Sequence, residues 1–372
     1  MQKVIHLVLG KANPNRMNGV SKVAHYHALY LHKLGSDVEI WGLTNTPGDP
    51  VIERDVITRL FRSQYFFRGL DPLLMMAIEK LEGDVVFHIH GALIPDFYLV
   101  SRILHAKKIP FVYTPHGAFN EVALRKNKLL KKLYISGFEK WMLRHAKMVQ
   151  FLGKSEYDNI ANIIKLKNKI IIPNGQSFEE LGFHYQSLQH RKTPVFGFCG
   201  RLDNYYKGLD LLIKAFSVYV DKNGKGELWL IGDGPDRQKL EQLVIATNLG
   251  NRVIFYGARY GEEKCNHISN MNVFVHPSHS EGSPTAVLEA AALGLPLLVT
   301  TGTNVGGLVD QYKCGIHIPN NNVETIADAL KDFDQLYING GLDKMKEASL
   351  KMVKQEFDWI KIAEKLTAIY NS

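Results

Sequence analysis

Short apolar runs alternate with helical patterns along the whole chain, and this alternation limits the folds open to it. The apolar runs predict twelve strands, at 3–9, 37–42, 84–89, 110–114, 148–152, 169–172, 194–199, 227–231, 252–256, 273–276, 296–300 and 315–318. Helical spacing of apolar residues falls between them, at 20–34, 71–82, 97–107, 128–145, 155–164, 208–222, 236–247, 284–293, 323–334 and 357–370. Such alternation is typical of parallel sheets with helices on both faces. Twelve strands exceed one ordinary open sheet, so the sequence predicts an α/β protein with two sheets in two domains.

The two predicted domains meet where the pattern is weakest. The chain has 372 residues, which is enough for two ordinary domains. No strand or helix pattern stands out between Gln176 and Pro194, and we place the junction there. This predicts an N-terminal domain over 1–175 and a C-terminal domain over 176–356, with a last helix at 357–372 that can pack on either.

Composition excludes several classes of protein. No apolar stretch approaches the length needed to span a bilayer, and the apolar N-terminus is expected to be a first buried strand. The three cysteines, Cys199, Cys265 and Cys314, are odd in number and far apart, which fits neither a zinc site nor a disulfide framework. A reducing cytoplasm is the simplest interpretation.

Positive charge is concentrated in the first half. Residues 1–175 hold 25 Lys and Arg against 14 Asp and Glu, whereas residues 176–372 hold 20 against 23. In 125–147 the cations alternate with apolar residues at helical spacing, and 59–68 is a weaker basic and aromatic stretch. Either these segments lie on an anionic membrane surface, or the helix in 125–147 is solvated with an ordinary core face. Nucleic acid is a less favoured partner, because no nucleic-acid-binding motif is present.

Two glutamates, Glu281 and Glu289, follow the strand predicted at 273–276. Pro284 suits the first turn of the next helix, so Glu281 falls in the loop and Glu289 inside the helix. Ligands of open α/β sheets bind at such strand ends, and free backbone N–H groups at a helix start favour anions. The predicted amide donors are those of Ser283, Thr285, Ala286 and Val287. A ligand with both hydroxyls and phosphates is indicated.

Two other strand ends of the second half carry cations or glycines. Arg201 and Lys207 follow the strand at 194–199, and the pair suits a diphosphate, although alone they are more often solvated loop cations. Gly232 follows the strand at 227–231 and allows a close backbone approach to a ligand, although Gly-x-Gly is usually a turn.

The first half offers a glycine and three histidines at strand ends. Gly19 opens a helix after the first strand, but the Gly-x-Gly-x-x-Gly dinucleotide fingerprint is missing, which argues against a nicotinamide enzyme. His88 and His90 share one face of a strand, so a metal pair is conceivable. No third ligand stands out, and hydrogen-bonded histidines at a sheet rim are favoured. His116 lies where a predicted strand ends and is followed by a glycine. It is either a contact to a sugar or phosphate or a core histidine.

The order of these motifs resembles the retaining glycosyltransferases of family 4, also called group 1, which have the GT-B fold. The strongest match is Glu281 and Glu289, with seven residues between them, followed by Gly-Leu-Pro at 294–296. The further matches are Asn18-Gly19-Val20, Thr114-Pro115-His116-Gly117, Pro173-Asn174-Gly175, Gly200-Arg201-Leu202 with Lys207-Gly208, and Gly232-Asp233-Gly234-Pro235. Together they cover nearly the whole chain.

The resemblance implies two Rossmann-like domains facing each other across a cleft, with the last helix crossing back to the N-terminal domain. The sugar donor is expected mainly on the C-terminal domain and the acceptor on the N-terminal one. The implied catalytic residues are Glu281 and His116 at the sugar and Arg201 and Lys207 at the diphosphate. The implied donor site further includes Glu289 at the ribose, Gly19, Gly232, Ser283, Thr285, Ala286 and Val287.

The implied reaction is retaining transfer from a nucleoside diphosphate sugar to a glycan, with no metal or other cofactor because cations and helix starts stabilise the leaving diphosphate. The expected acceptor is an oligosaccharide or a polyprenyl-diphosphate-linked glycan of bacterial surface polysaccharide (capsule, exopolysaccharide or lipopolysaccharide), made at the cytoplasmic face of the membrane. The alternatives are a nucleotide-sugar 2-epimerase of the same fold and a non-catalytic sugar-nucleotide-binding module.

The chain departs from the family pattern at two loops. Asn18-Gly19 stands where the family often has two glycines, and Ser283-Pro284 stands where an aromatic–glycine pair is usual. Pro284 has no N–H, so the donor loop has one amide fewer. We therefore expect Ser283-Pro284 to bear on which sugar is transferred.

Overall fold

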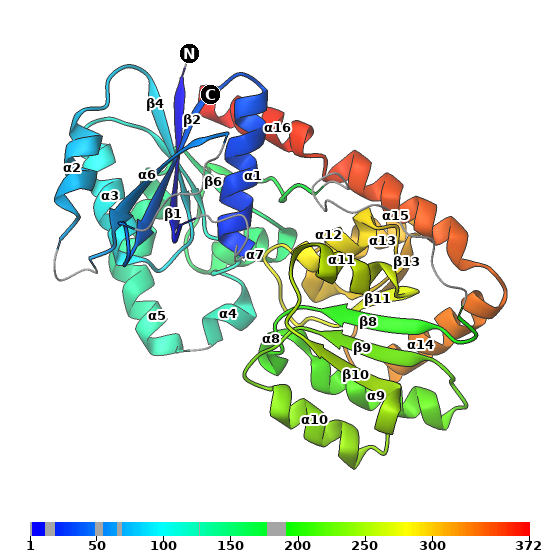
Figure 1. Ribbon diagram of the computed structural model, residues 1–372. Helices are drawn as coiled ribbons and strands as arrows, with labels where there is room; N and C mark the ends of the chain where they lie inside the picture. Colours follow the sequence, from blue (N-terminus) through cyan, green and yellow to red (C-terminus); the bar gives the residue numbers. More distant parts are fainter. Residues whose placement is uncertain (1, 12–18, 49–54, 65–68, 126, 177–190) are drawn as a thin grey trace. The chain divides into compact units, whose positions relative to one another are not determined.

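The computed structural model describes residues 2–11, 19–48, 55–64, 69–125, 127–176 and 191–372. The chain forms two compact units, the first from Met1–Gly175 together with Trp359–Ser372 and the second from Gln176–Asp358. Each unit contains one parallel sheet with helices on both faces (Figure 1). This is the two-sheet α/β architecture that the sequence predicts.

The first unit has a seven-stranded parallel sheet in the order β3-β2-β1-β4-β5-β6-β7. Its strands are β1 (Lys3–Leu9), β2 (Asp37–Thr44), β3 (Ile57–Arg62), β4 (Val85–His90), β5 (Phe111–Thr114), β6 (Met148–Phe151) and β7 (Lys169–Ile171). The strand order changes direction between β1 and β4, and ligands of such sheets bind beyond the carboxyl ends of strands at this switch point.

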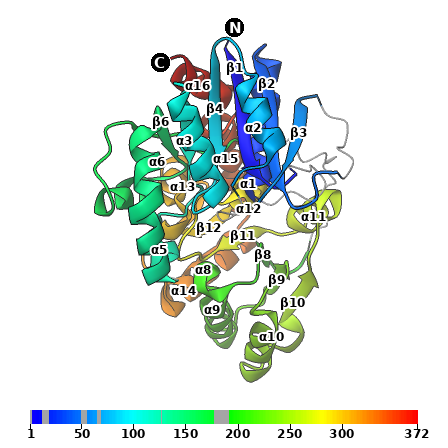
Figure 2. The same ribbon diagram turned by 90° about the vertical axis from the view of Figure 1, so that its left-hand side faces the viewer.

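Helices cover both faces of the first sheet (Figures 1 and 2). One face packs against α1 (Gly19–Lys33) and α16 (Trp359–Asn371). The other packs against α2 (Pro72–Glu79), α3 (Pro95–Ala106) and α6 (Lys140–His145). The remaining helices are α4 (Glu121–Arg125), α5 (Lys128–Tyr134) and α7 (Lys154–Asn159). Tyr370 on α16 is buried and hydrogen-bonds His88 on β4, so the last helix is part of this core.

The second unit has a six-stranded parallel sheet in the order β10-β9-β8-β11-β12-β13. Its strands are β8 (Val195–Cys199), β9 (Glu227–Ile231), β10 (Val253–Gly257), β11 (Val273–His276), β12 (Leu297–Thr300) and β13 (Gly315–Ile318). One face is covered by α11 (Gly261–Ser269), α12 (Thr285–Ala292), α13 (Gly306–Tyr312) and α15 (Leu342–Glu356). The other is covered by α9 (Leu209–Asp221), α10 (Arg237–Ala246) and α14 (Val323–Ile338), and α8 (Asn204–Lys207) is a single turn after β8. The switch point lies between β8 and β11.

Strand β3 is absent from the predicted strands. It is an edge strand in which Phe61 alone is buried, with its ring centroid 5.2 Å from that of Trp41. Arg59 on its outer part pairs with Glu39, Nε to Oε2, at 3.0 Å. A strand that is buried at only one position has no run of apolar residues by which to recognise it. The sequence of 59–68 therefore shows only its basic and aromatic residues, which suggest a membrane-facing segment. Residues 59–62 belong to strand β3 of the sheet, whereas 65–68 lies outside the described residues.

The helix predicted at 128–145 is interrupted by a π-helical turn at Ile135–Glu139. Before the turn, Leu129, Leu130 and Leu133 on α5 are 72, 70 and 64 % exposed. After the turn, Met142 and Leu143 on α6 are buried in the core. The core interpretation of this segment is therefore right for α6, while α5 presents its leucines to solvent.

Candidate active site

One carboxylate oxygen of Glu281, in the loop after β11, is the centre of a hydrogen-bond network. Its Oε1 accepts from Ser278 Oγ at 2.6 Å and from His276 Nε2 at 2.8 Å, and it pairs with Lys207 Nζ. Burial raises the pKa of Glu281, but the hydrogen bond from His276 and the charge of Lys207 outweigh burial and lower the pKa to about 2. Glu281 is therefore a carboxylate at neutral pH and can only accept hydrogen bonds.

The backbone around Glu281 is fixed by the loop after β12. The Glu281 N–H donates to Gly302 O at 2.8 Å, and Asn304 Nδ2 donates to the Glu281 carbonyl at 2.7 Å. A Cβ at Gly302 would lie 2.4 Å from Ser278 O, so only glycine allows the two loops to come this close. The carboxylate at the sheet's switch point is thus held through both its side chain and its backbone.

Lys207 reaches Glu281 because the backbone at Gly208 packs on the end of β11. Gly208 has φ +62°, in the left-handed region, and a Cβ there would lie 2.5 Å from Pro277 O. The N–H of His279 donates to Tyr206 O at 2.8 Å and fastens α8 to the same loop. The glycine that follows Lys207 is thereby explained by a close approach between backbones.

Gly208→Ala is expected to disturb the site and the fold together. The added methyl group meets the Pro277 carbonyl, and the left-handed conformation alone costs an alanine about 1 kcal/mol. We expect a lower melting temperature and a loss of activity. Gly250→Ala is the matched control, because Gly250 has φ +51° with open space around its Cβ position. The control should lose a little stability and keep full activity; equal behaviour of the two variants would contradict the close approach at Gly208.

Arg201 lies in the loop after β8 but does not join the Glu281 network. Its side chain is 69 % exposed, and its Nη2 is 4.0 Å from Asp203 Oδ2.

Gly232 lies at the end of β9, close to the end of β8. A Cβ at Gly232 would lie 1.9 Å from Gly200 O, and the Gly232 N–H donates to Gly257 O at 2.8 Å. Gly232 therefore allows two neighbouring strand ends to approach closely, and its predicted contact with a ligand stays a prediction.

Glu289 lies inside α12 and is 4 % exposed. Both of its carboxylate oxygens accept from Lys264 Nζ on α11, each at 2.9 Å. This pair joins two helices on one face of the sheet and places a second carboxylate beside a cation.

The start of α12 differs from the prediction. Pro284 occupies the N-cap position, just before the helix, and the first helical residue is Thr285. The N–H of Thr285 donates to Ser283 O at 3.0 Å and that of Val287 donates to Pro284 O at 2.9 Å, so these two amides are engaged. The amides of Ser283 and Ala286 have no such partner in the described chain. The predicted row of free donors is thus reduced to two.

In the first unit, His116 lies at the end of β5 in a strained backbone conformation, with φ +55°. The loop that carries it is held by Glu156, which accepts from the N–H groups of Gly117 and Phe119 at 2.9 Å each. Burial raises the pKa of Glu156 to about 7 despite these bonds. Strained residues cluster at functional sites, which supports a role for His116.

His116 lines a cavity of about 330 Å³ at the switch point of the first sheet. The other lining residues are Leu9, Val20, His90, Gly91, Ala92, Ile94, Pro115, Gly117 and Ala118. Gly19 opens α1 next to Val20, is exposed, and has open space at its Cβ position. The cavity is large enough for a sugar-sized group within this unit.

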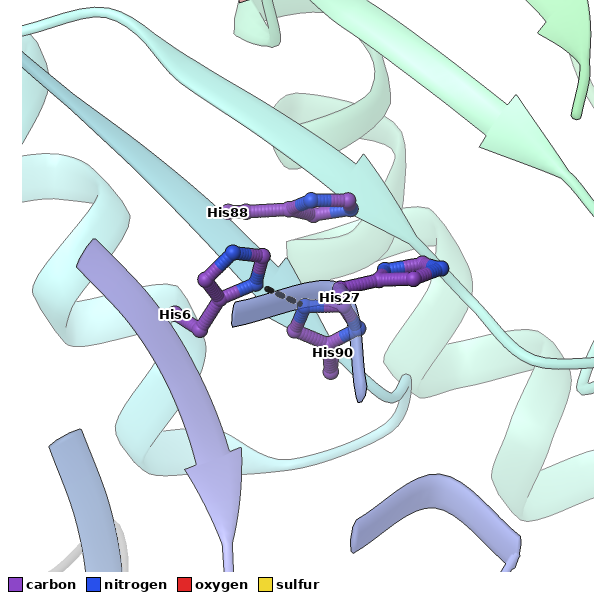
Figure 3. Close-up of side chains that lie close together, drawn as sticks. All are labelled: His6, His27, His88 and His90. Carbon is purple, nitrogen blue, oxygen red and sulfur yellow. Dashed lines mark hydrogen bonds between the residues drawn. The ribbon is translucent and has the colours of Figure 1, made fainter. Parts of the chain in front are cut away.

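His88 and His90 belong to a cluster of four buried histidines (Figure 3). His6 from β1 and His27 from α1 complete it, and one ring nitrogen of each lies within 4.8 Å of the others. The spacing along β4 therefore indicates only two of the four histidines that the fold brings together. Hydrogen bonding is confirmed, since His88 bonds Tyr370 Oη at 2.6 Å and Thr114 Oγ1 at 2.7 Å.

Sequence reasoning missed several residues of these sites. His276 and Ser278 lie within five residues of Glu281, so a polar strand end beside a carboxylate was a usable signal. Lys264 is 25 residues from Glu289, and only packing of α11 on α12 brings them together. Glu156 is 39 residues from Gly117, and nothing in its local sequence marks it.

Comparison with known proteins gives a consistent family for both halves of the chain. Residues 183–348 match the family described as glycosyl transferases group 1, and residues 17–179 match the one described as glycosyltransferase family 4. The two matches follow each other and together span most of the sequence.

Three relatives illustrate the range of the family. An uncharacterized glycosyltransferase of Haemophilus influenzae is 24 % identical over 96 % of this chain and 97 % of its own. The phosphatidylinositol N-acetylglucosaminyltransferase gpi3 subunit of Schizosaccharomyces pombe is 26 % identical over 78 % of this chain and 62 % of its own. The capsular polysaccharide biosynthesis glycosyltransferase CapM of Staphylococcus aureus is 26 % identical over 57 % of each chain. This chain thus spans under two thirds of the length of some relatives.

Solved structures share the fold over the full length. Sucrose-phosphate synthase from Thermosynechococcus elongatus superposes with a TM-score of 0.78 at 20 % identity, covering 99 % of this chain and 98 % of its own. Anabaena HepE in complex with UDP gives 0.78 at 14 %, covering 99 % of each. The fold is therefore that of the GT-B glycosyltransferases. The chain belongs to the group 1, family 4 glycosyltransferases and is a transferase of the glycosyl-transferring class.

Proposed function

We propose that this enzyme transfers a sugar from a nucleoside diphosphate sugar to a glycan acceptor with retention of the anomeric configuration. The observation that carries the proposal is the Glu281 network, in which a largely buried carboxylate and the Lys207 ammonium meet at the switch point of the second sheet. A sugar hydroxyl donates to a carboxylate, and a phosphate oxygen accepts from an ammonium. The pair therefore suits a ligand that carries both groups side by side.

Charge is the main catalytic means in this proposal. Departure of the nucleoside diphosphate places negative charge on its terminal phosphate, and a positioned cation or amide stabilises that charge as it develops. Lys207 is held 18 % exposed, where its charge is weakly screened. Arg201, in its exposed position, and the amides of Ser283 and Ala286 are the further donors we assign to the diphosphate. With these groups, no metal is required in the proposal.

Retention follows from attack on the face that the phosphate leaves. The C1–O bond to the phosphate breaks, the acceptor oxygen bonds C1 on the same face, and the acceptor proton passes to the leaving phosphate oxygen. A covalent route would need a nucleophile on the other face. Glu281 is a weak one, because three donors on its Oε1 and a pKa of about 2 reduce the basicity of the carboxylate. We therefore assign Glu281 to sugar hydroxyls, and Glu289 to the ribose.

A donor screen tests the proposal directly. Melting temperature is measured with UDP-, GDP-, ADP- and CMP-sugars, and transfer is then assayed with the donor that stabilises the protein. The neighbour solved with UDP makes UDP-sugars the first choice. We expect a stabilising donor whose effect is lost in Glu289→Ala and transfer only with acceptor present. A changed sugar configuration at C2 without acceptor would instead identify an epimerase, and binding without turnover a non-catalytic module.

The acceptor we propose is a lipid-linked glycan at an anionic membrane surface, for a role in surface polysaccharide synthesis on the cytoplasmic side. The support is a basic cavity of about 390 Å³ in the first unit, lined by Arg125, Lys128, Lys131, Lys132 and Lys140 among others. The exposed leucines of α5 adjoin these lysines in sequence. CapM, by its name, acts in capsule synthesis and the yeast relative acts on a phospholipid. No helix in the described ranges is long and apolar enough to cross a membrane.

Replacing the three α5 leucines with serine is expected to weaken membrane binding. Each exposed leucine that enters the lipid surface contributes about 1 kcal/mol or more, so loss of all three should lower vesicle affinity by about a hundredfold or more. The measurement is sedimentation with vesicles that contain or lack anionic lipid. Ile245→Ser with Ile338→Ser is the matched control, since these residues are 76 and 69 % exposed elsewhere. Equal and negligible binding of the unaltered protein to both vesicle types would contradict the membrane proposal.

A further inference from the structure

Three histidines of the first unit form one chain of hydrogen bonds that ends at the cavity. His6 Nδ1 bonds His90 Nε2 at 2.8 Å, as Figure 3 shows, and His90 Nδ1 bonds His116 Nε2 at 3.1 Å. His6 and His90 are fully buried on β1 and β4, and His116 lines the cavity. The remaining nitrogen of His116, Nδ1, makes no hydrogen bond to the described part of the chain. It is the atom left for an occupant of the cavity.

The three rings are neutral at neutral pH. Burial lowers the pKa of His6 and of His116 to about 3 in each case. Burial, together with the neighbouring histidines, also lowers the pKa of His90. Each ring therefore carries one N–H and one lone pair.

Two hydrogen bonds between three neutral rings permit only two arrangements of protons. If His90 carries its proton on Nδ1, it donates to His116, and His6 must donate to His90; His116 then carries its proton on Nδ1. If His90 carries its proton on Nε2, both bonds reverse, and His116 presents a bare Nδ1. The tautomers of the three rings are thus coupled, and the state of His116 is set together with those of His6 and His90.

The buried end of the chain distinguishes the two arrangements. His6 Nε2 is enclosed and has no partner in the described residues. In the first arrangement this atom is a bare lone pair, whereas in the second it is an N–H without an acceptor. Buried N–H groups without an acceptor are the rarer case. The first arrangement, in which His116 presents N–H to the cavity, is therefore favoured.

We propose that His6 and His90 are positioning residues that hold His116 as a neutral Nδ1–H donor facing the cavity. We refer to His6, His90 and His116 together as the relay. The donor suits an oxygen that only accepts, as in a phosphate, or a sugar hydroxyl oxygen. This rests on the proposed function, because the occupant expected in the cavity carries the sugar or phosphate oxygens of a glycosyl transfer. Glu156 holds the loop that carries His116, and His6 and His90 keep the ring proton of His116 on Nδ1.

The same histidines do not favour a metal centre. Five of the eight ring nitrogens in the four-histidine cluster are hydrogen-bonded, including both on His88 and both on His90. Ligation by His88 or His90 would displace one of these bonds, because the ligating nitrogen gives its lone pair to the ion and cannot hold a proton. The zinc content of the purified protein therefore tests the relay, and we expect no bound zinc. One tightly bound zinc ion per chain that is lost in His6→Phe would overturn the relay.

Two substitutions at His90 separate its two contacts. His90→Asn places an amide near the position of Nδ1, so it can still donate to His116 while the contact with His6 is lost. His90→Gln places the amide near Nε2, so the contact with His116 is lost. We expect kcat to fall by about tenfold or more in His90→Gln, since small misplacements of a reacting group have effects of this size. His90→Asn should stay within about threefold of the unaltered enzyme, with similar melting temperatures for both variants.

Nitrogen-15 NMR of the histidine rings gives a readout that does not depend on activity. We expect the proton of His116 on Nδ1 in the unaltered protein and in His90→Asn, and a shift toward Nε2 in His90→Gln. A proton on Nε2 in the unaltered protein, or equal tautomers in both variants, would overturn the relay. His116→Phe tests the other assumption: unchanged kcat in that variant would remove His116 from the proposed function, while the NMR result would still decide the relay.

Discussion

Glu281→Gln is expected to reduce turnover by about two to three orders of magnitude, the range seen when one preorganised polar contact to a transition state is removed. The substitution keeps the shape of the side chain. It keeps a neutral carbonyl oxygen opposite Lys207, His276 and Ser278, removes the negative charge, and places an N–H₂ donor at the position of Oε2, which can only accept in the unaltered protein. Both the sugar contact and the position of Lys207 are then disturbed. The measurement is initial-rate transfer with the donor found by the thermal screen.

The same variant carries a stability signature with a definite pH dependence. The folded protein lowers the pKa of Glu281 from 4.5 to about 2, so the carboxylate stabilises the fold above pH 4.5 by about 3 kcal/mol. This contribution is lost as pH falls from 4.5 toward 2. We expect Glu281→Gln to be less stable than the unaltered protein at pH 7, with a gap that narrows below pH 4.5. A gap independent of pH would contradict the ionised, paired carboxylate.

Asp328→Asn is the matched control for the carboxylate. Asp328 pairs with Lys222 at 2.9 Å, but their side chains are 64 and 45 % exposed, against 12 and 18 % for Glu281 and Lys207. Exposed pairs contribute about 0–1 kcal/mol. The control should therefore change neither turnover nor stability by a measurable amount.

Lys207→Ala is expected to have a comparable effect on turnover, about two to three orders of magnitude, because it removes the partly buried cation assigned to the leaving diphosphate. It also leaves Glu281 with His276 and Ser278 as its donors among the contacts described above. Breaking a buried pair at one side costs about 3–5 kcal/mol, so a lower melting temperature is expected as well.

Lys222→Ala gives the control for the cation and completes a double-mutant comparison. For Lys207 and Glu281, the loss in the double variant should be well below the sum of the two single losses, because the residues act together. For Lys222 and Asp328 the coupling should be close to zero. Near-normal transfer by both Lys207→Ala and Glu281→Ala would remove the assignment of this site.

Much of the fold follows from local pattern. Buried parallel strands such as Val195–Cys199 read as unbroken apolar runs because both faces are covered. Strand β3 escaped prediction because an edge strand buried at Phe61 alone has no such run. Helix α11 is short and polar, with buried Cys265, Ile268 and Ser269, and its apolar spacing is too sparse to stand out.

Local sequence predicts the residues of the site but not their contacts. Lys207 and Glu281 are predictable because each follows a strand, and parallel strand ends meet at one edge of a sheet. Their direct pairing depends on Gly208 packing against Pro277, a contact between segments about 70 residues apart that no local pattern encodes. The amide donors predicted at α12 were reduced because Pro284 lies outside the helix and its carbonyl accepts from Val287. The four histidines come from three elements, and only the β4 pair has a readable spacing.

The most direct test of the central proposal is the anomeric configuration of the product. The enzyme is incubated with the stabilising nucleoside diphosphate sugar and an acceptor, and the new glycosidic linkage is examined by proton NMR. We expect a product of the unaltered enzyme with the same C1 configuration as the donor, and a severely reduced yield of that product with Glu281→Gln. A product with the opposite configuration would contradict same-face transfer at this site.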